Sequence, residues 1–122
     1  MPFTARERPL YEVKANLFKG LAHPFRIRIL ELLAAAPEVS VAELQDETGL
    51  EASHLSHHLA VLRRHRLVES ERRASHVYYR LADRRVADLL AVARALLLEL
   101  LATDSARFDE ALSLPALPSA RA

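Results

Sequence analysis

The sequence predicts a mainly α-helical protein with one small β-hairpin, a winged helix-turn-helix of about five helices and a two-stranded wing. Apolar residues recur at helical spacing over most of the chain, and two of the helical segments are separated only by a tight turn at Thr48-Gly49. Between residues 67 and 81 the apolar residues instead alternate with polar ones, which is the spacing of a half-buried strand.

The first two helices are each expected to begin at a proline, whose missing N–H has no intrahelical partner in the first turn. Pro9 marks the first start, and His23-Pro24 interrupts the chain and restarts it. The second helix is expected to stop near Pro37. Helical spacing relates Leu10, Val13, Leu17 and Leu21 in the first helix, and Phe25, Ile29, Leu32 and Leu33 on the buried side of the second.

A short third helix and a fourth one flank the predicted turn. Ser40 and Glu43 form a capping-box pattern, in which the serine side chain accepts a hydrogen bond from the N–H three residues on. The third helix then runs to about Thr48-Gly49, because glycine commonly follows a helix end. The fourth helix spans about residues 51–65 and has the core stripe Leu55, Leu59 and Leu62.

The hairpin and the last helix complete the domain. Residues 67–72 and 76–81 are the expected strands, and the tip contains no glycine, which leaves the turn type open. The last helix spans about residues 84–103, and its wide apolar arc is expected to pack on the domain and on a second subunit. Residues 1–113 form the predicted domain, and residues 114–122, with two prolines, a flexible tail.

Composition limits the classes of protein to which the chain can belong. A length of 122 residues fits one domain, and 51% hydrophobic with 27% charged residues is typical of a globular protein. There is no cysteine, which excludes disulfides and thiolate metal ligands. No signal peptide is visible, and Asp88, Arg94 and Glu99 interrupt the leucine-rich stretch 86–102, so we expect a cytoplasmic protein without a membrane span.

The charge is unevenly distributed along the chain. The net charge is only +1 at pH 7, yet residues 63–85 hold eight arginines against three carboxylates. A basic segment on an otherwise acidic chain is compatible both with a polyanionic partner and with a merely solvated face.

Three blocks of sequence occur in a recognisable order: LFKGLAHPFRIRILELL, then SVAELQDETGLEASHLSHHLAVLRRHRLVES, then VYYRLAD. Together they strongly resemble the ArsR/SmtB family of bacterial winged-helix repressors, over about residues 10–102. The resemblance implies a homodimer that binds double-stranded operator DNA and leaves it when an inducer, often a metal ion, binds.

The resemblance also assigns the DNA-reading surface. Residues 51–65 match the recognition helix, whose polar side enters the major groove, and the hairpin tip matches the wing. The family often has serine and glutamine where this chain has Glu51 and Ala52, so the operator sequence cannot be carried over from relatives. A wing glycine common in the family is also missing. The predicted DNA-binding residues are Ser53, His54, Ser56 and His57, which face the major groove, Arg63 and Arg64, which contact the DNA backbone, and Arg72, Arg73, Ser75 and His76 in the wing.

The first and last helices are the predicted dimerisation elements. A domain this small has little interior to cover so wide an apolar arc as that of the last helix. The predicted dimer-interface residues are Leu10, Val13, Leu17, Leu89, Val92, Leu96, Leu97 and Leu100.

The metal sites that the family commonly uses are not expected here. The third helix has no cysteine, and the last helix has no histidine. His54 and His58, four residues apart, could share one transition-metal ion at a non-standard site, and His65 and His76 could approach across the hairpin without a third ligand. We favour DNA contact or solvation for His54 and His57 and a partly buried, hydrogen-bonded His58, and therefore no cofactor. Protonation of His54 and His57 would add charge toward phosphate and make DNA binding sensitive to pH.

Other functions fit the sequence less well. No HExxH, G-x-S-x-G or phosphate-loop pattern is present, so we do not expect an enzyme. A metal-responsive regulator with a non-standard histidine site, a regulator that depends on a protein co-regulator, and a winged-helix protein-interaction module remain the alternatives to a DNA-binding repressor.

Overall fold

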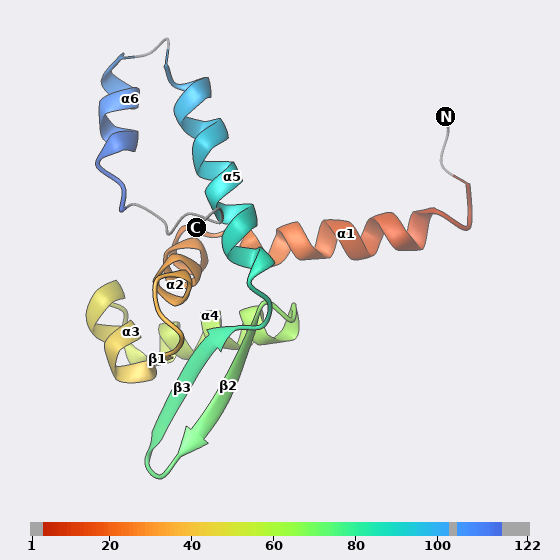
Figure 1. Ribbon diagram of the computed structural model, residues 1–122. Helices are drawn as coiled ribbons and strands as arrows, with labels where there is room; N and C mark the ends of the chain where they lie inside the picture. Colours follow the sequence, from red (N-terminus) through yellow and green to blue (C-terminus); the bar gives the residue numbers. More distant parts are fainter. Residues whose placement is uncertain (1–3, 103–104, 116–122) are drawn as a thin grey trace.

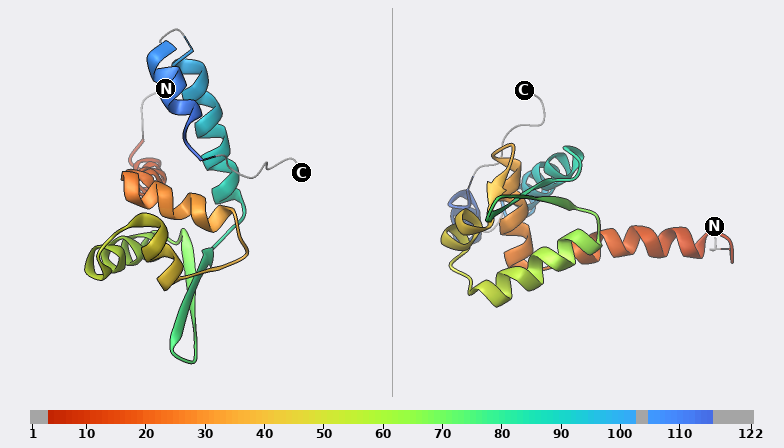
Figure 2. Two further views of the ribbon diagram at one scale, coloured as in Figure 1. Left: turned by 90° about the vertical axis from the view of Figure 1, so that its left-hand side faces the viewer. Right: turned by 90° about the horizontal axis from the view of Figure 1, so that it is seen from below.

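The structure, a computed structural model, describes residues 4–102 and 105–115 and contains six helices and a three-stranded antiparallel sheet within these ranges (Figure 1). Helices α2, α3 and α4 and the sheet form the body, α5 and α6 rise from it, and α1 extends away as an arm (Figure 2). In chain order the elements are α1 (Arg8–Leu21), α2 (Pro24–Ala34), β1 (Val39–Ser40), α3 (Val41–Thr48), α4 (Ala52–Arg64), β2 (Val68–Arg73), β3 (His76–Leu81), α5 (Arg85–Leu100) and α6 (Ser105–Leu112).

One hydrophobic cluster joins α2, α3, α4, the sheet and α5. Helices α2 and α4 supply half of it, including the predicted Ile29 and Leu33 of α2, and Leu32 packs against it while partly buried. Phe25 is an exception, since its side chain is 40% exposed and lies beside the ring of His58 at the edge of the body. The completely buried large side chains are Ile29, Leu30, Leu33, Leu44, Leu55, Leu62 and Leu67.

The helix boundaries follow the capping chemistry predicted from the sequence. Prolines occupy the first turns of α1 and α2, and the His23 Nδ1 accepts a hydrogen bond from the Phe25 N–H at 3.1 Å. At the start of α3 the Ser40 Oγ accepts a hydrogen bond from the Glu43 N–H at 3.1 Å. Gly49 ends α3 with a φ of 71°, in the left-handed region that glycine enters without steric cost.

The sheet has three strands rather than the two expected from the sequence. In the strand order β1-β3-β2, the short β1 places Val39 opposite Tyr79 and Ser40 opposite Tyr78. Two residues are too few to show an alternating pattern, so this strand gives no signal in the sequence. Its pairing attaches the wing to the segment that leads into α3.

The hairpin closes with a two-residue loop. Strands β2 and β3 pair from Val68 opposite Leu81 at the base to Arg73 opposite His76 at the tip. Ala74, the first loop residue, has a φ of 55°, whereas Ser75 does not have a positive φ. A positive φ at the first position alone is the pattern of a type II′ turn, which matches the twist of hairpin strands. The wing therefore forms without the glycine that this position normally favours.

The long last helix predicted from the sequence is α5, and a separate helix follows it. The chain leaves α5 at Leu100, and α6 packs beside it with Ala111 only 5% exposed (Figure 1). The sequence did not predict α6. Residues 116–122 of the expected tail lie outside the described residues.

Helix α1 contacts the body only near its C-terminal end. Gly20 is its only buried residue, and the rest of the helix projects away from α2 and α4 (Figures 1 and 2). Within the described ranges, no helix is both long enough and apolar enough to span a membrane.

Candidate nucleic-acid interface

Helix α4 has one side in the core and one side in solvent. Leu55, Leu59 and Leu62 are between 0% and 3% exposed and fix the helix to the body. The four polar residues predicted to read DNA are all exposed on the other side: Ser53, His54, Ser56 and His57. The structure confirms the predicted division of the helix, and contact of this face with DNA stays a prediction.

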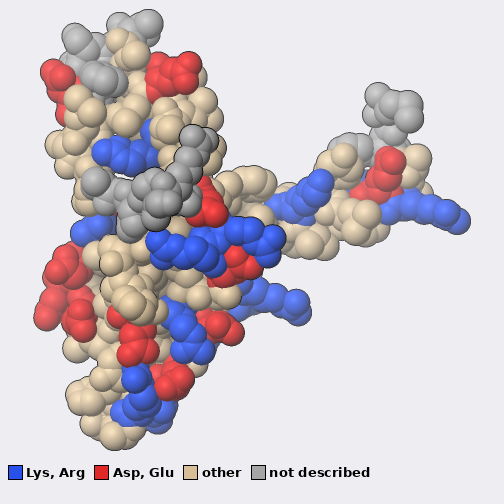
Figure 3. Space-filling model, viewed as in Figure 1, with Lys and Arg blue, Asp and Glu red and all other residues tan. Residues whose placement is uncertain are grey.

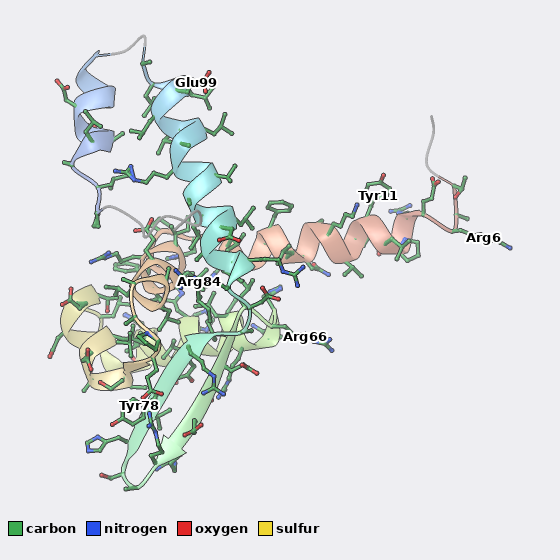
Figure 4. All side chains as sticks on the ribbon, in the orientation of Figure 1. Arg6, Tyr11, Arg66, Tyr78, Arg84 and Glu99 are labelled. Atoms are coloured by element: carbon green, nitrogen blue, oxygen red, sulfur yellow. The ribbon has the colours of Figure 1, made fainter. Side chains whose placement is uncertain are left out.

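Three exposed arginines lie at the end of α4, at positions 63, 64 and 66. Arg63 and Arg64 lie in the last turn and are exposed. Arg66 takes a φ of 59°, and the Leu67 N–H bonds to the Leu62 carbonyl at 3.0 Å, which is a Schellman ending. Figure 4 shows Arg66 pointing outward from this end of α4, on the side of α1.

In the wing, Arg73 is engaged within the protein. Its guanidinium forms an ion pair with Glu38, lies 3.3 Å from a Glu71 oxygen and stacks over the Tyr78 ring at 3.9 Å. The hydrogen bond to Glu38 and the nearby carboxylates raise the pKa of Arg73 above its ordinary value. Arg80 likewise lies 3.6 Å from an oxygen of Glu71. The sequence missed this neutralisation because Glu38 reaches the wing only through β1.

Arg72 is the wing arginine that remains available to a partner. It is exposed and forms no ion pair among the residues that the structure describes. Since side chains alternate along a strand, Arg72 leaves the opposite face of β2 from Arg73. The predicted wing residues Ser75 and His76 are also exposed at the tip, where His76 lies opposite Arg73. Figure 3 shows basic and acidic side chains interleaved along the wing.

Acidic residues border this surface. Glu43, Asp46 and Glu47 are exposed on α3, where Figure 3 shows acidic side chains gathered, and Glu51 precedes α4. A phosphate backbone is repelled by these carboxylates and attracted by the arginines of α4 and the wing. The charge pattern therefore limits the orientations in which this face can approach DNA.

His58 lies on the buried side of α4, apart from the exposed His54 and His57. It is 8% exposed, its Nδ1 lies 3.4 Å from an Arg26 nitrogen, and its ring centroid is 4.4 Å from that of His23. Burial lowers the pKa of His58, and the positive charges of the neighbouring His23, Arg26, His57 and His54 lower it further. The expected hydrogen bond of His58 is confirmed, and its side chain is more deeply buried than the partly buried position expected from the sequence, whereas His54 and His57 lie on the exposed side of α4.

The lowered pKa of His58 predicts a loss of stability in mild acid. The unfolded chain takes up the proton near pH 6.5, the ordinary histidine pKa, whereas the folded protein takes it up only at lower pH. The free energy of unfolding should therefore fall as the pH drops below about 6.5. Urea unfolding of wild type and His58→Asn between pH 8 and pH 5 isolates this contribution, and parallel pH profiles for the two proteins would contradict it.

The residues present do not fit the metal sites common in proteins of this pattern. Helix α3 has no cysteine and α5 has no histidine. Over residues 4–102 and 105–115, no three His, Asp or Glu side chains are grouped so that they could hold a metal ion. The expected approach of His65 to His76 is wrong, because His65 precedes the base of the hairpin and His76 lies at its tip.

The predicted dimerisation residues form two exposed apolar faces, one on α1 and one on α5. Leu89 differs from the others in being half-buried. Phe18 of α1 is also 57% exposed, and the sequence did not single it out. The exposed predicted residues are Leu10, Val13 and Leu17 on α1, and Val92, Leu96, Leu97 and Leu100 on α5.

Helix α3 ends at Gly49, buried leucines hold the following helix α4 against the body, and the paired strands β2 and β3 form a wing. This arrangement defines a winged helix-turn-helix protein. A helix-turn-helix domain model matches residues 21–71. The helix-turn-helix-type transcriptional regulator Rv0081 of Mycobacterium tuberculosis is 50% identical over 94 residues, which are 76% of this chain and 82% of that protein. The chain belongs to the ArsR/SmtB family of transcriptional regulators.

Solved structures agree with this membership. The crystal structure of Rv0081 matches with a TM-score of 0.73 at 49% identity, over 78% of this chain and 95% of that one. A homodimeric winged helix-turn-helix DNA-binding domain from Mycobacterium bovis, a possible ArsR-family regulator, matches with a TM-score of 0.69 at 32% identity, over 79% of this chain and 88% of that one. The biofilm growth-associated repressor of Agrobacterium fabrum is 39% identical over 90 residues, covering 74% of this chain and 75% of that protein.

Proposed function

We propose that the protein is a homodimeric, sequence-specific repressor that binds an inverted-repeat operator in the cytoplasm, without catalysis and without a metal cofactor. The observation that carries the proposal is the exposed Ser53–His57 side of α4, held in place by buried leucines on the opposite side. The short hydroxyls and imidazoles on this face are able to reach base edges and phosphates in the major groove.

Two further features support the proposal. The apolar faces of α1 and α5 leave seven of the predicted interface residues exposed, which is the surface that a second copy would cover. Solved structures of a homodimeric relative and of a transcriptional repressor share the fold. A two-fold dimer would place its α4 helices on half-sites about one helical turn apart, in a DNA inverted repeat.

Arg72→Ala tests the assignment of the wing. We expect weaker binding to the operator and a slope of log affinity against log salt that is smaller by about 1, because one phosphate contact is lost. Fluorescence anisotropy with a duplex from the protein's own upstream region measures both quantities. Arg85→Ala is the matched control, since Arg85 is 85% exposed at the start of α5 and pairs with Asp83.

The same titration distinguishes a sequence-specific repressor from the main alternative, a protein-interaction module. A wild-type protein that binds its upstream duplex no better than a random duplex at low salt would exclude a sequence-specific repressor and favour a protein-interaction module. An unchanged salt slope in Arg72→Ala would instead exclude only the wing from the DNA contact.

A further inference from the structure

Helix α1 is joined to the end of α4 by one close contact. A Cβ added to Gly20 would lie 2.9 Å from the Cβ of His65, so only glycine permits this approach. Beyond the contact, an open cleft separates Val13 and Leu17 from residues 64–66. The right-hand view of Figure 2 shows the two helices meeting end to end at this point. The direction of α1 relative to α4 is therefore fixed at the contact between Gly20 and His65, which we call the joint.

Arg26 of α2 bridges this joint. Its Nε donates a hydrogen bond to the Gly20 carbonyl at 2.8 Å, and its Nη2 donates one to the Lys19 carbonyl at 3.3 Å. Carbonyls in the last turn of a helix lack i+4 partners and carry the negative end of the helix dipole, and here the Lys19 carbonyl also accepts a hydrogen bond from the Ala22 N–H at 3.2 Å. A planar guanidinium can bond to two such carbonyls at once, whereas a lysine ammonium is a single point charge.

The third nitrogen of the same guanidinium reaches the recognition helix. Arg26 Nη1 lies 3.4 Å from the His58 Nδ1, and because arginine only donates, the imidazole nitrogen is the acceptor. His58 is buried on the inner side of α4. One side chain thus connects the end of α1 with the middle of α4.

We propose that Arg26 is a positioning residue that sets the angle between α1 and α4, and through it the operator half-site spacing that the dimer prefers. The inference rests on the proposed function, in which α1 takes part in the dimer and α4 enters the major groove. Adding one base pair between half-sites moves them by about 3.4 Å and rotates them by about 35°. A joint that holds the helix angle would therefore select one spacing.

The test uses an inverted repeat that the wild-type protein selects from random-sequence duplexes, and derivatives with one or two base pairs added or removed at the centre. Arg26→Gln is compared with Arg28→Gln, which removes the same charge from α2. Arg28 pairs only loosely with Glu31 and Glu47, at 3.9 and 3.8 Å, and takes no part in the joint.

We expect Arg26→Gln to bind the selected duplex between about 2-fold and 30-fold more weakly than wild type. The loss of affinity in Arg26→Gln should be smaller on duplexes with altered spacing, so that the variant discriminates less among spacings. The slope of log affinity against log salt should stay unchanged. Arg28→Gln should retain the wild-type preference.

Variants of His58 examine the joint from the side of α4. His58→Asn keeps an acceptor near the Nδ1 position, whereas His58→Leu removes it, so only His58→Leu should flatten the spacing preference. The chain has no cysteine, so a spin label can be attached at Ala60→Cys alone. Ala60 is an exposed residue of α4, and the label reports the distance between the two α4 helices of the dimer. Adding Arg26→Gln should broaden that distance distribution.

The outcomes distinguish failure of the positioning role of Arg26 from failure of the proposed function. An equal loss on all spacings in Arg26→Gln, or no loss on any, overturns the positioning role even if the wild type binds its repeat. The same holds for an unchanged distance distribution in the folded variant. A wild-type protein that selects no inverted repeat overturns the proposed function and this inference with it.

Discussion

Replacing Val92 and Leu96 with glutamate should convert the protein into a monomer and lower its operator affinity by about 100-fold or more, because the two half-sites would then be bound independently. Val92 is 67% exposed and Leu96 is 55% exposed, one turn apart on α5. Two carboxylates on this face would have to be buried unpaired in a dimer. The fold itself should persist, since neither side chain belongs to the core.

Light scattering coupled to size-exclusion chromatography gives the oligomeric state, and the operator titration gives the affinity. Ala42→Glu combined with Ala82→Glu is the control for the oligomeric state, because both alanines are exposed and neither lies on α1 or α5. A dimer that survives the Val92 and Leu96 substitutions would show that α5 does not form the interface.

Leu55→Ala should cost about 2–5 kcal/mol of the free energy of unfolding, the range for a large aliphatic side chain removed from a packed core. Leu55 is 1% exposed and lies between Ser53 and His57 in sequence but on the opposite side of α4. Loss of the Leu55 side chain removes one of the contacts that hold α4 against the body and leaves a cavity beneath the helix. Operator binding should weaken at temperatures where the variant remains largely folded.

Denaturation in urea, followed by circular dichroism, measures this cost. Leu112→Ala removes the same atoms from a side chain that is 52% exposed, and we expect a change of about 0.5 kcal/mol or less there. Similar losses for the two variants would mean that burial of Leu55 does not hold α4 in place.

Local chemistry made helices α1 to α5 predictable from the sequence, whereas α6 was not predicted. The cap at Ser40, the left-handed ending at Gly49 and the leucine spacing of α4 each depend on residues within a few positions of one another. The division of α4 into a buried and an exposed side followed from the same spacing.

Features formed by residues far apart in the chain escaped prediction. Strand β1 exists only because Val39 pairs with Tyr79, and that pairing brings Glu38 to Arg73. The contacts of Arg26 depend on how α2 crosses α1 and α4. No spacing rule within one segment reports such contacts, so the sequence overestimated the free positive charge of the wing.

Because α1 is attached to the body at a single turn, the folding of α1 should depend on the concentration of the protein in the cell. A 14-residue helix is marginally stable alone in water, and α1 has only Gly20 buried in the body. If α1 contributes to the dimer, the folding of this arm becomes a bimolecular event that is favoured as the protein accumulates. Synthesis of the chain would then control both the number of DNA-binding units and the fraction whose arms are ordered, which makes the response to abundance steeper than proportional.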